Sequence, residues 1–591
     1  MHKIYEKKIE DFKKEECKQK KISRLYLYGK LLSFAAMVGF AYLSYNQLNA
    51  LNISFILIFL VFYIVSYVLD DKCKNIIDTL KSMQTVCKNE INYLNGVFTE
   101  FDSGDKYINP QHEFSYDLDI FGPNSFFNRI NRTITQKGSD RLAEKLTNLS
   151  TDTDKINSNQ EAIVELNKLP DWRIKFIANN KIESNLELLS GYISPNKYKN
   201  ILINSILPYI SIALSLSSLV LGIMGILPFY FFLGMFSIQI LITIFVSKIS
   251  AKTSIQTDKL HKEYLGYLAI LKDIHKVELK SKVLSGLKKE LFESGTSSLD
   301  SFKQLSRILN LFDQRASAIM YIVLNGTILY DVILIKLFVK WGEKYLPHVN
   351  NWINCISEID ALVSLSNYAF NNPANTLATI MSEDSENIIQ AKNVYHPFLS
   401  HKKAVPNDFI LKRSNIAIVT GANMAGKSTF LRTIGMTYIM ASNGIPVCAE
   451  TFSFSIVSLF SSMRTTDDLS KDVSYFNAEL IRLKQLIEYV KSHRFTFIIL
   501  DEILKGTNSK DKLKGSIMFL NEISKYNISA IIATHDLELA KLEEKDSSTY
   551  LNYCFEIELS EEITYSYKIE NGVAQNLNAS YLLSNILSDA N

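Results

Sequence analysis

The chain has 591 residues, of which 47% are apolar and 21% are charged. This length suits about three to five domains of ordinary size, and the composition excludes both a disordered chain and one that lies wholly in a membrane. The net charge of +3 argues against a general electrostatic attraction to nucleic acid, although a local basic surface is compatible with it. Six scattered cysteines without a CxxC pair indicate no disulfide framework and no structural metal site.

The first 30 residues are rich in lysine and glutamate, which predicts a charged helix, and no signal-peptide cleavage pattern accompanies them. Residues 31–69 contain no Asp, Glu, Lys, Arg or His, and residues 46–49 divide them into two apolar runs. A second uncharged stretch, residues 201–247, is divided near residues 225–228. Because a helix needs about 20 apolar residues to cross a bilayer, each stretch predicts a transmembrane hairpin, the first of marginal length. A buried helical hairpin in a soluble core is the alternative.

Basic residues flank both hairpins, whereas the hairpin tips carry no charge. Those beside the first are Lys18, Lys20, Lys21, Arg24, Lys30, Lys72 and Lys74, and those beside the second are Lys197, Lys199, Lys248 and Lys252. By the positive-inside rule, we expect a multi-pass protein of the cytoplasmic (inner) membrane, with both tips outside and the rest in the cytoplasm. A third apolar run, residues 316–330, is interrupted by polar residues and predicts a buried core helix rather than a span.

The sequence pattern changes near residue 386, where helical periodicity is followed by short apolar runs that alternate with helical stretches. This pattern is typical of an α/β nucleotide-binding domain, whose last strands, near residues 553–559 and 563–569, should be antiparallel. We therefore predict a mixed fold, with a helical region that carries the transmembrane hairpins and a C-terminal α/β P-loop domain. The predicted segments are a charged N-terminal helix (1–30), transmembrane hairpin 1 (31–69), a soluble helical segment (70–200), transmembrane hairpin 2 (201–247), a helical lever or core (248–385) and the ATPase domain (386–591).

The strongest local signal is a complete GxxxxGK[ST] motif, since residues 421–428 read GANMAGKS. The motif follows an apolar strand and precedes a helix, where backbone N–H groups can surround phosphates. We expect Lys427 to contact the β- and γ-phosphates of ATP, and the Ser428 hydroxyl to bind Mg²⁺. The predicted nucleotide-binding residues are Gly421, Asn423, Met424, Gly426, Lys427, Ser428 and Thr429.

Two further motifs follow the P-loop in the same domain. The apolar run at residues 495–500 ends in Asp501 and Glu502. We expect Asp501 to lie near Mg²⁺, and Glu502 to orient or deprotonate the attacking water. His535 follows another apolar strand and could sense or polarise the nucleotide. Lys427, Glu502 and His535 are therefore the candidate catalytic residues, and Ser428 and Asp501 are the candidate metal ligands.

At these motifs the sequence resembles the MutS family, whose ATPases are of the ABC type. Residues 420–429 (TGANMAGKST) are similar to that family's TGPNMGGKST. Further similarities lie at residues 395–397 (YHP), 405–408 (VPND), 467–469 (DDL), 474–476 (SYF) with Glu479, 501–502 (DE) with 506–507 (GT), and 533–535 (ATH). Upstream, Thr135, Gly138 and Leu142, residues 159–163 and residues 362–366 resemble the family's helical core. The resemblance covers about residues 115–200 and 300–585.

The resemblance implies a homodimer in which two ATPase domains face each other and Ser474 completes the partner's site. Asp472 stands where the family signature usually has glycine, which puts this in-trans role of Ser474 in question. Ala404 occupies the expected position of an adenine-stacking aromatic, for which Tyr395 and Phe398 are possible replacements. No N-terminal domain like the one that carries the Phe-x-Glu mismatch reader of the family's repair proteins is recognised, and the lysine-rich start and the first hairpin stand in its place.

Three functions remain open from the sequence. The first is a membrane-anchored ATPase that uses dimer-composite sites to drive conformational change, with DNA as one potential substrate. The second is a repair protein that binds mismatched or branched DNA, for which a local basic face could be formed by Lys272, Lys276, Lys280, Lys282, Lys288 and Lys289. The third is a component of an ABC-type transporter, although the spans hold no ionisable residue.

Overall fold

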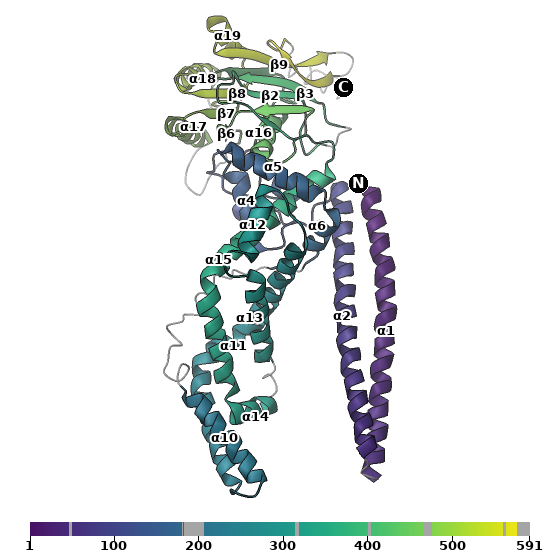
Figure 1. Cartoon of the computed structure of the whole chain (residues 1–591). Coiled ribbons are helices and arrows are strands. Elements are labelled where there is room, and N and C mark those ends of the chain that lie inside the picture. Colours follow the sequence, from purple (N-terminus) through teal and green to yellow (C-terminus); the bar gives the residue numbers. More distant parts are fainter. Residues whose placement is uncertain are drawn as a thin grey trace, which may run out of the picture.

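The computed structural model describes residues 1–46, 50–179, 181–182, 206–313, 318–399, 403–464, 475–506, 508–559 and 563–575. The described chain is mostly helical as far as residue 371, and a C-terminal α/β domain follows. Two helical projections extend from the molecule in the same direction, away from the α/β domain (Figure 1). We call them the first leg (α1 and α2) and the second leg (α10, α11, α12, α13, α14 and α15).

The first leg is an antiparallel pair of long helices, α1 (His2–Asn46) and α2 (Ala50–Leu94). Each helix runs without a break between its charged part and its apolar part, so the charged N-terminal segment and the first span of hairpin 1 form one helix, α1. Lys30 and Asp70 form an ion pair at 2.6 Å where the uncharged stretch begins. Nearer the tip, the rings of Phe40 and Phe55 stack with centroids 4.9 Å apart.

A helical core joins both legs and lies below the α/β domain (Figure 1). It is built from η1 (Asp105–Tyr107), α3 (Phe126–Ile130), α4 (Gln136–Thr147), α5 (Thr153–Asn167), α6 (Pro170–Ile177) and the upper part of α15 (Tyr330–Asn371). The Thr135/Gly138 motif begins α4, because the Thr135 side chain accepts a hydrogen bond from the Gly138 N–H. Asp360 of α15 lies against this turn, and a Cβ on Gly138 would approach its Oδ2 to 2.1 Å.

The second leg consists of α10 (Leu207–Ile223), α11 (Tyr230–Lys276), α12 (Lys282–Phe292) at its upper end, α13 (Ser298–Asp313), α14 (Ala318–Ile328) and α15. The prediction of a buried core helix at residues 316–330 is wrong. Helix α14 lies across the leg, and Ile319 on its outer face is 78% exposed. An apolar run shows that a helix avoids water, but not whether protein or another medium covers it.

The α/β domain contains a six-stranded sheet in the order β10-β9-β4-β8-β7-β6, and a four-stranded sheet in the order β1-β5-β2-β3. The strands are β1 (Thr379–Ile380), β2 (Asn387–Val394), β3 (Asn407–Lys412), β4 (Ile416–Gly421), β5 (Thr451–Phe454), β6 (Ser458–Ser462), β7 (Thr496–Asp501), β8 (Ile528–Ala533), β9 (Tyr550–Leu559) and β10 (Ile563–Asn571). The helices are α16 (Lys427–Ser442), α17 (Tyr475–Ser492), α18 (Ser509–Ile523), η4 (Leu537–Lys541) and α19 (Leu542–Lys545). As predicted, β9 and β10 are antiparallel.

The apolar core continues from the helical region into this domain without interruption. Gly435 of α16 illustrates the contact, since a Cβ there would lie 2.9 Å from Leu118 of the core and 2.8 Å from Ile499 of β7. Because close packing transmits displacement, the helix that follows the P-loop is mechanically joined to the core.

Candidate functional site

Three neighbouring parallel strands end at one edge of the six-stranded sheet, and each carries one of the predicted motifs. Strand β4 leads into the P-loop, β7 ends in Asp501, and β8 leads to His535. Strand β8 pairs with β4 on one side and with β7 on the other. Ligands of open α/β sheets bind at this carboxyl edge, so the sheet brings the three motifs to one place.

The P-loop has the backbone shape of a phosphate cradle. Gly421 and Gly426 have φ values of 148° and 107°, which side chains rarely allow. A Cβ on Gly421 would lie 2.7 Å from the backbone oxygen of Phe555. Met424, at the tip of the loop, also has a positive φ and is 80% exposed. Helix α16 begins at Lys427, so its unpaired N–H groups point toward the loop.

Lys427 is buried, and its ammonium group donates hydrogen bonds to the carbonyls of Gly421 and Ala422, both at 2.8 Å. Burial lowers the pKa of Lys427 to about 8, although the carboxylates of Asp501 and Glu502 act in the opposite direction. In this conformation the P-loop's own carbonyls hold the lysine. A phosphate would replace these acceptors with a stronger, charged one.

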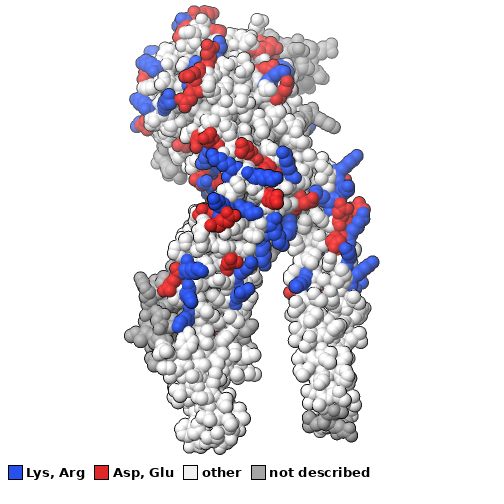
Figure 2. All heavy atoms as spheres, in the orientation of Figure 1, with Lys and Arg blue, Asp and Glu red and all other residues white. Residues whose placement is uncertain are grey.

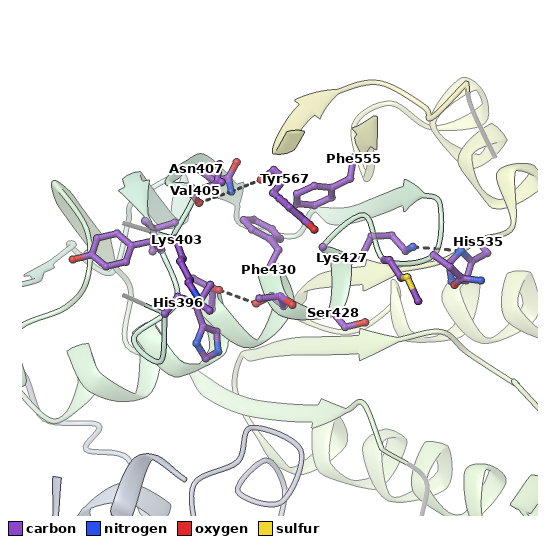
Figure 3. Close-up of a pocket in the computed structure, with 18 residues that line it drawn as sticks. His396, Lys403, Val405, Asn407, Lys427, Ser428, Phe430, His535, Phe555 and Tyr567 are labelled. Carbon is purple, nitrogen blue, oxygen red and sulfur yellow. Dashed lines mark hydrogen bonds between the residues drawn. The ribbon is translucent and has the colours of Figure 1, made fainter. Parts of the chain in front are cut away.

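His535 lies directly beside Lys427, with its Nδ1 3.3 Å from the lysine Nζ and 3.0 Å from the Gly421 carbonyl oxygen (Figure 3). A carbonyl can only accept, so we assign the proton to Nδ1, which leaves a lone pair on Nε2. Burial lowers the pKa of His535, and the Lys427 ammonium lowers it further. The ring is therefore neutral near pH 7 and able to accept a hydrogen bond.

Glu502 follows β7 with a φ of 64°, and its N–H donates to the Ala533 carbonyl at 2.9 Å. Its carboxylate forms an ion pair with Lys512 of α18, a residue that the sequence did not single out. Burial raises the pKa of Glu502, but the hydrogen bond and charge of Lys512 outweigh it and hold this pKa below its usual value. The carboxylate is therefore ionised and available as a proton acceptor.

Glu479 fixes the loop that follows these acids. It is buried on α17 and accepts hydrogen bonds from the N–H groups of Lys505 and Gly506 at 3.0 and 3.1 Å. Helix α17 thereby positions the turn between Glu502 and α18. Ser474 and Asp472 lie outside the described residues, so the signature segment itself has no structural account here.

A cavity of about 510 Å³ opens beside the P-loop, and it is large enough for a nucleotide. Among the predicted site residues, Asn423, Met424, Gly426, Lys427, Ser428, Thr429 and His535 line it. Its other end is formed by segments around Tyr395 and Lys403 (Figure 3). Tyr395 therefore occupies a position suited to a base. Phe398 instead stacks beneath the Arg129 guanidinium, 4.2 Å from the ring centroid.

Tyr567 is a cavity residue that the sequence did not reveal. It lies at an irregularity in the pairing of β10 with β9 and has a φ of 53°. Asn407 of β3 holds this backbone by donating to the Tyr567 carbonyl at 3.1 Å and accepting from the Ile569 N–H at 2.9 Å. The Tyr567 ring thus reaches the P-loop, 3.1 Å from where a Cβ on Gly426 would lie.

These residues fit Mg-ATP by the chemistry of their donors and acceptors. The glycine cradle, the α16 N-terminus and Lys427 suit phosphates, while a hydroxyl (Ser428) and a carboxylate (Asp501) are oxygen ligands of the kind that Mg²⁺ prefers. Among the described residues, no group of three His, Cys, Asp or Glu side chains is arranged to hold a metal. A metal ion here would therefore be held jointly with nucleotide phosphates, as is usual for Mg²⁺.

Comparison with known proteins supports the assignment of this domain. Residues 417–584 match the family model for MutS domain V. The chain is 32% identical over 241 residues to the DNA mismatch repair protein MutS of Caldicellulosiruptor saccharolyticus, covering 39% of this chain and 27% of the relative. It is 28% identical over 270 residues to MutS protein homolog 4 of Mus musculus, covering 42% and 28% respectively.

A further relative, the DNA mismatch repair protein MutS of Acetivibrio thermocellus, is 32% identical over 253 residues, or 41% of this chain and 28% of the relative. The match thus spans little more than a quarter of the length of these curated relatives. It contains the domain that carries the P-loop, Asp501, Glu502 and His535. Residues 417–584 therefore form a domain of the MutS family, matching MutS domain V.

Proposed function

We propose that this protein is a membrane-anchored MutS-like ATPase that binds and hydrolyses Mg-ATP. The observation that carries the proposal is the convergence of a glycine-lined phosphate cradle, a buried lysine, an ionised glutamate and a neutral histidine at one sheet edge. Each of these groups has a distinct role in phosphoryl transfer to water. The similarity to MutS proteins adds support.

In this proposal, Lys427 exchanges the P-loop carbonyls for nucleotide phosphates. Ser428 and Asp501 hold Mg²⁺, which when bound neutralises charge on the phosphates. Glu502 orients the attacking water and accepts its proton, provided that the Lys512 ion pair opens or rotates. His535 accepts a hydrogen bond through Nε2 and reports on the phosphate site through its contact with Lys427.

The two legs support membrane anchorage. Figure 2 shows Lys, Arg, Asp and Glu side chains over the upper part of the molecule and the tops of the legs, whereas the visible surface of the lower parts of both legs shows none. By length and composition, α1 and α2 are each apolar enough to cross a membrane, and α10 and the first part of α11 are shorter apolar helices. We propose that both legs enter the cytoplasmic membrane from the same side, with their tips outside.

Nucleotide binding can reach the legs through α15. Beyond the end of this helix, Asn375 Nδ2 donates to the Pro446 carbonyl at 3.2 Å. The Thr376 N–H donates to the Val447 carbonyl, and the Val447 N–H donates to the Thr376 carbonyl. These partners directly follow α16, the helix that begins at Lys427. We propose that a homodimer closed by ATP shifts α16, and that α15 carries this shift to the second leg.

ATP turnover by the purified full-length chain tests the proposal. Glu502→Gln should lower turnover about 100-fold or more but retain nucleotide, whereas Lys427→Ala should lose both. Lys412→Ala, on an exposed position of β3, is the matched control and should behave as wild type. Unchanged turnover in both site variants would refute the site.

A second candidate function is DNA repair, which is favoured by the names of the relatives. Lys272, Lys276, Lys280, Lys282 and Lys289 are exposed on the upper part of α11 and on or beside α12, whereas Lys288 is half-buried and donates to the Val277 carbonyl. Titration with matched and mismatched duplexes should then stimulate the ATPase, with affinity that falls steeply with salt. Absence of any DNA effect at low salt would leave the membrane role alone.

A further inference from the structure

Helix α14 leaves an apolar face uncovered in the lower part of the second leg (Figure 1). Ile319 is 78% exposed, and Met320, Ile322 and Val323 are each about half exposed. The sequence of the helix, AIMYIVLNGTI, contains no charged residue. A continuous apolar face of this kind marks a contact with lipid or with another apolar surface.

The contacts of α14 determine its level along the leg. The Asn325 Oδ1 lies 3.5 Å from the Thr243 Oγ1 of α11. A Cβ on Gly326 would lie 2.2 Å from the Phe236 ring, so the two helices are in close contact there. Both partners belong to the uncharged first part of α11, residues 230–247. Whatever medium surrounds that part of α11 therefore surrounds α14 as well.

The chain turns sharply after α14 instead of continuing across the leg. Leu329 adopts a left-handed conformation with a φ of 48°, and α14 meets α15 at 79°. Helix α15 then runs toward the helical core. Near the beginning of α15, the Lys336 ammonium lies over the Tyr209 ring, 4.7 Å from its centroid. Tyrosine and lysine are typical of a membrane–water interface, and Tyr209 lies at the start of the apolar helix α10. The Tyr330 hydroxyl at the start of α15 donates to the Leu311 carbonyl near the end of α13 at 3.2 Å, so the chain approaches and leaves this element at neighbouring points.

The polar groups at the bend are satisfied inside the protein. Asn325 and Asp331 are both fully buried. Asn325 Oδ1 accepts from the Asp331 N–H at 2.9 Å, and Asn325 Nδ2 donates to the Tyr321 carbonyl at 3.0 Å. Leu329 packs in a cluster with Ile212 of α10 and Ile242 of α11. Irregular backbone is tolerated at membrane depth only where protein buries it in this way.

We infer that α14 and the first turn of α15 form a re-entrant element embedded among the acyl chains of a phospholipid bilayer. The element adds a third piece of membrane structure to the two hairpins, and its exposed face extends the lipid-facing surface of α10 and α11. Asn325 and Asp331 are the internal polar pair that allows the chain to turn back at this depth. The inference rests on the proposed membrane anchorage of the second leg.

Depth-dependent fluorescence quenching on the full-length protein in liposomes tests this. The background is Cys17→Ser, because Cys17 is exposed and the other five cysteines are buried. A bimane label is placed on Ile322→Cys in α14, on Ser237→Cys at an exposed position of the apolar part of α11, and on Asn350→Cys at an exposed position high on α15. Phospholipids brominated on their acyl chains should quench Ile322→Cys and Ser237→Cys to a similar extent and leave Asn350→Cys bright.

The outcomes distinguish the inferred re-entrant element from the proposed membrane anchorage of the second leg. Quenching at Ser237→Cys without quenching at Ile322→Cys would overturn the re-entrant element and leave the hairpin in the membrane. A crosslink between subunits at Ile322→Cys in that case would assign the face to a second copy of the chain. Loss of quenching at both positions would overturn the membrane anchorage and the re-entrant element together. Retained ATP turnover confirms that each labelled variant is folded.

Discussion

The two legs join the helical core through buried carboxylates in opposite electrostatic surroundings. In the first leg, Glu90 of α2 meets a charged partner, because Arg132 Nε donates to its Oε1 at 2.5 Å. In the second leg, Asp360 of α15 accepts from neutral groups, namely the Thr135 hydroxyl at 2.7 Å and the backbone N–H groups of Ile134 and Thr135. Burial raises the pKa of Asp360 to about 7.

This difference indicates different mechanical roles. We call the contact of Glu90 with Arg132 the first joint and the contact of Asp360 with Ile134 and Thr135 the second joint. The first joint also includes Asn371, whose amide group donates to Glu90 at 2.7 Å and accepts from the Tyr5 hydroxyl at 2.8 Å. Both helices of the first leg are thereby fastened to the end of α15. The second joint combines the ion pairs of Glu358 with Arg141 and Lys145, each at 2.5 Å, with the carboxyl group of Asp360, whose pKa burial raises to about 7. A fixed anchor and a pH-adjustable contact are therefore both built on a buried carboxyl group.

The largest expected effect is at the first joint. Glu90→Ala leaves the buried Arg132 guanidinium without its carboxylate and should destabilise the fold by about 3–5 kcal/mol. Thermal unfolding of the detergent-solubilised protein measures the change. Glu100→Ala removes an exposed glutamate nearby and should stay within about 0.5 kcal/mol of wild type. Equal melting of the Glu90 variant and wild type would show that the cluster does not fasten the first leg.

A smaller effect is expected where α4 meets α15. Gly138→Ala places a methyl group 2.1 Å from the Asp360 Oδ2 and 2.7 Å from the Thr135 Oγ1. The displacement of α15 should cost about 2–3 kcal/mol. Gly286→Ala is the matched control, because it lies within α12 and its Cβ would meet nothing within 4 Å. That control should stabilise the protein by about 0.5–1 kcal/mol, so two identical substitutions should shift the melting temperature in opposite directions.

The sequence predicted best what depends on local structure. The P-loop lies between β4 and α16 as expected, because a strand–glycine loop–helix pattern is specified within a few residues. The periodicity of apolar residues likewise predicted the antiparallel last strands and the change from helical to α/β structure. The Thr135/Gly138 pattern was recognised by resemblance, but its cause, the approach of Asp360, lies 222 residues further along the chain.

The features that sequence did not reveal depend on distant packing. Tyr567 reaches the P-loop because an irregular strand is held by Asn407, and no local pattern specifies that contact. Lys512 pairs with Glu502 only once α18 turns back toward β7. The exposure of α14 also depends on how few neighbours the second leg provides. An apolar sequence predicts that a segment avoids water, whereas the tertiary structure determines whether other protein segments cover it.

The smallest expected effect is the pH dependence of the folding stability that Asp360 contributes at the second joint. The pKa of Asp360 is raised from 3.8 to about 7 in the folded protein, so its protonated form favours folding. This contribution is complete below pH 3.8 and is lost as the pH rises through about 7. Between pH 5 and pH 7, the loss should amount to about 2 kcal/mol. Asp360→Asn cannot ionise, so its stability relative to wild type should rise by this amount over the same interval.

Melting temperatures of both proteins across this range measure the difference, and any constant offset from the changed hydrogen bonds is subtracted. Glu100→Ala serves again as the control for a substitution at an exposed position. Parallel profiles for Asp360→Asn and wild type would mean that the carboxyl does not titrate in this interval. The second joint would then be as fixed as the first, and α15 would transmit the movement of α16 without adjustment by pH.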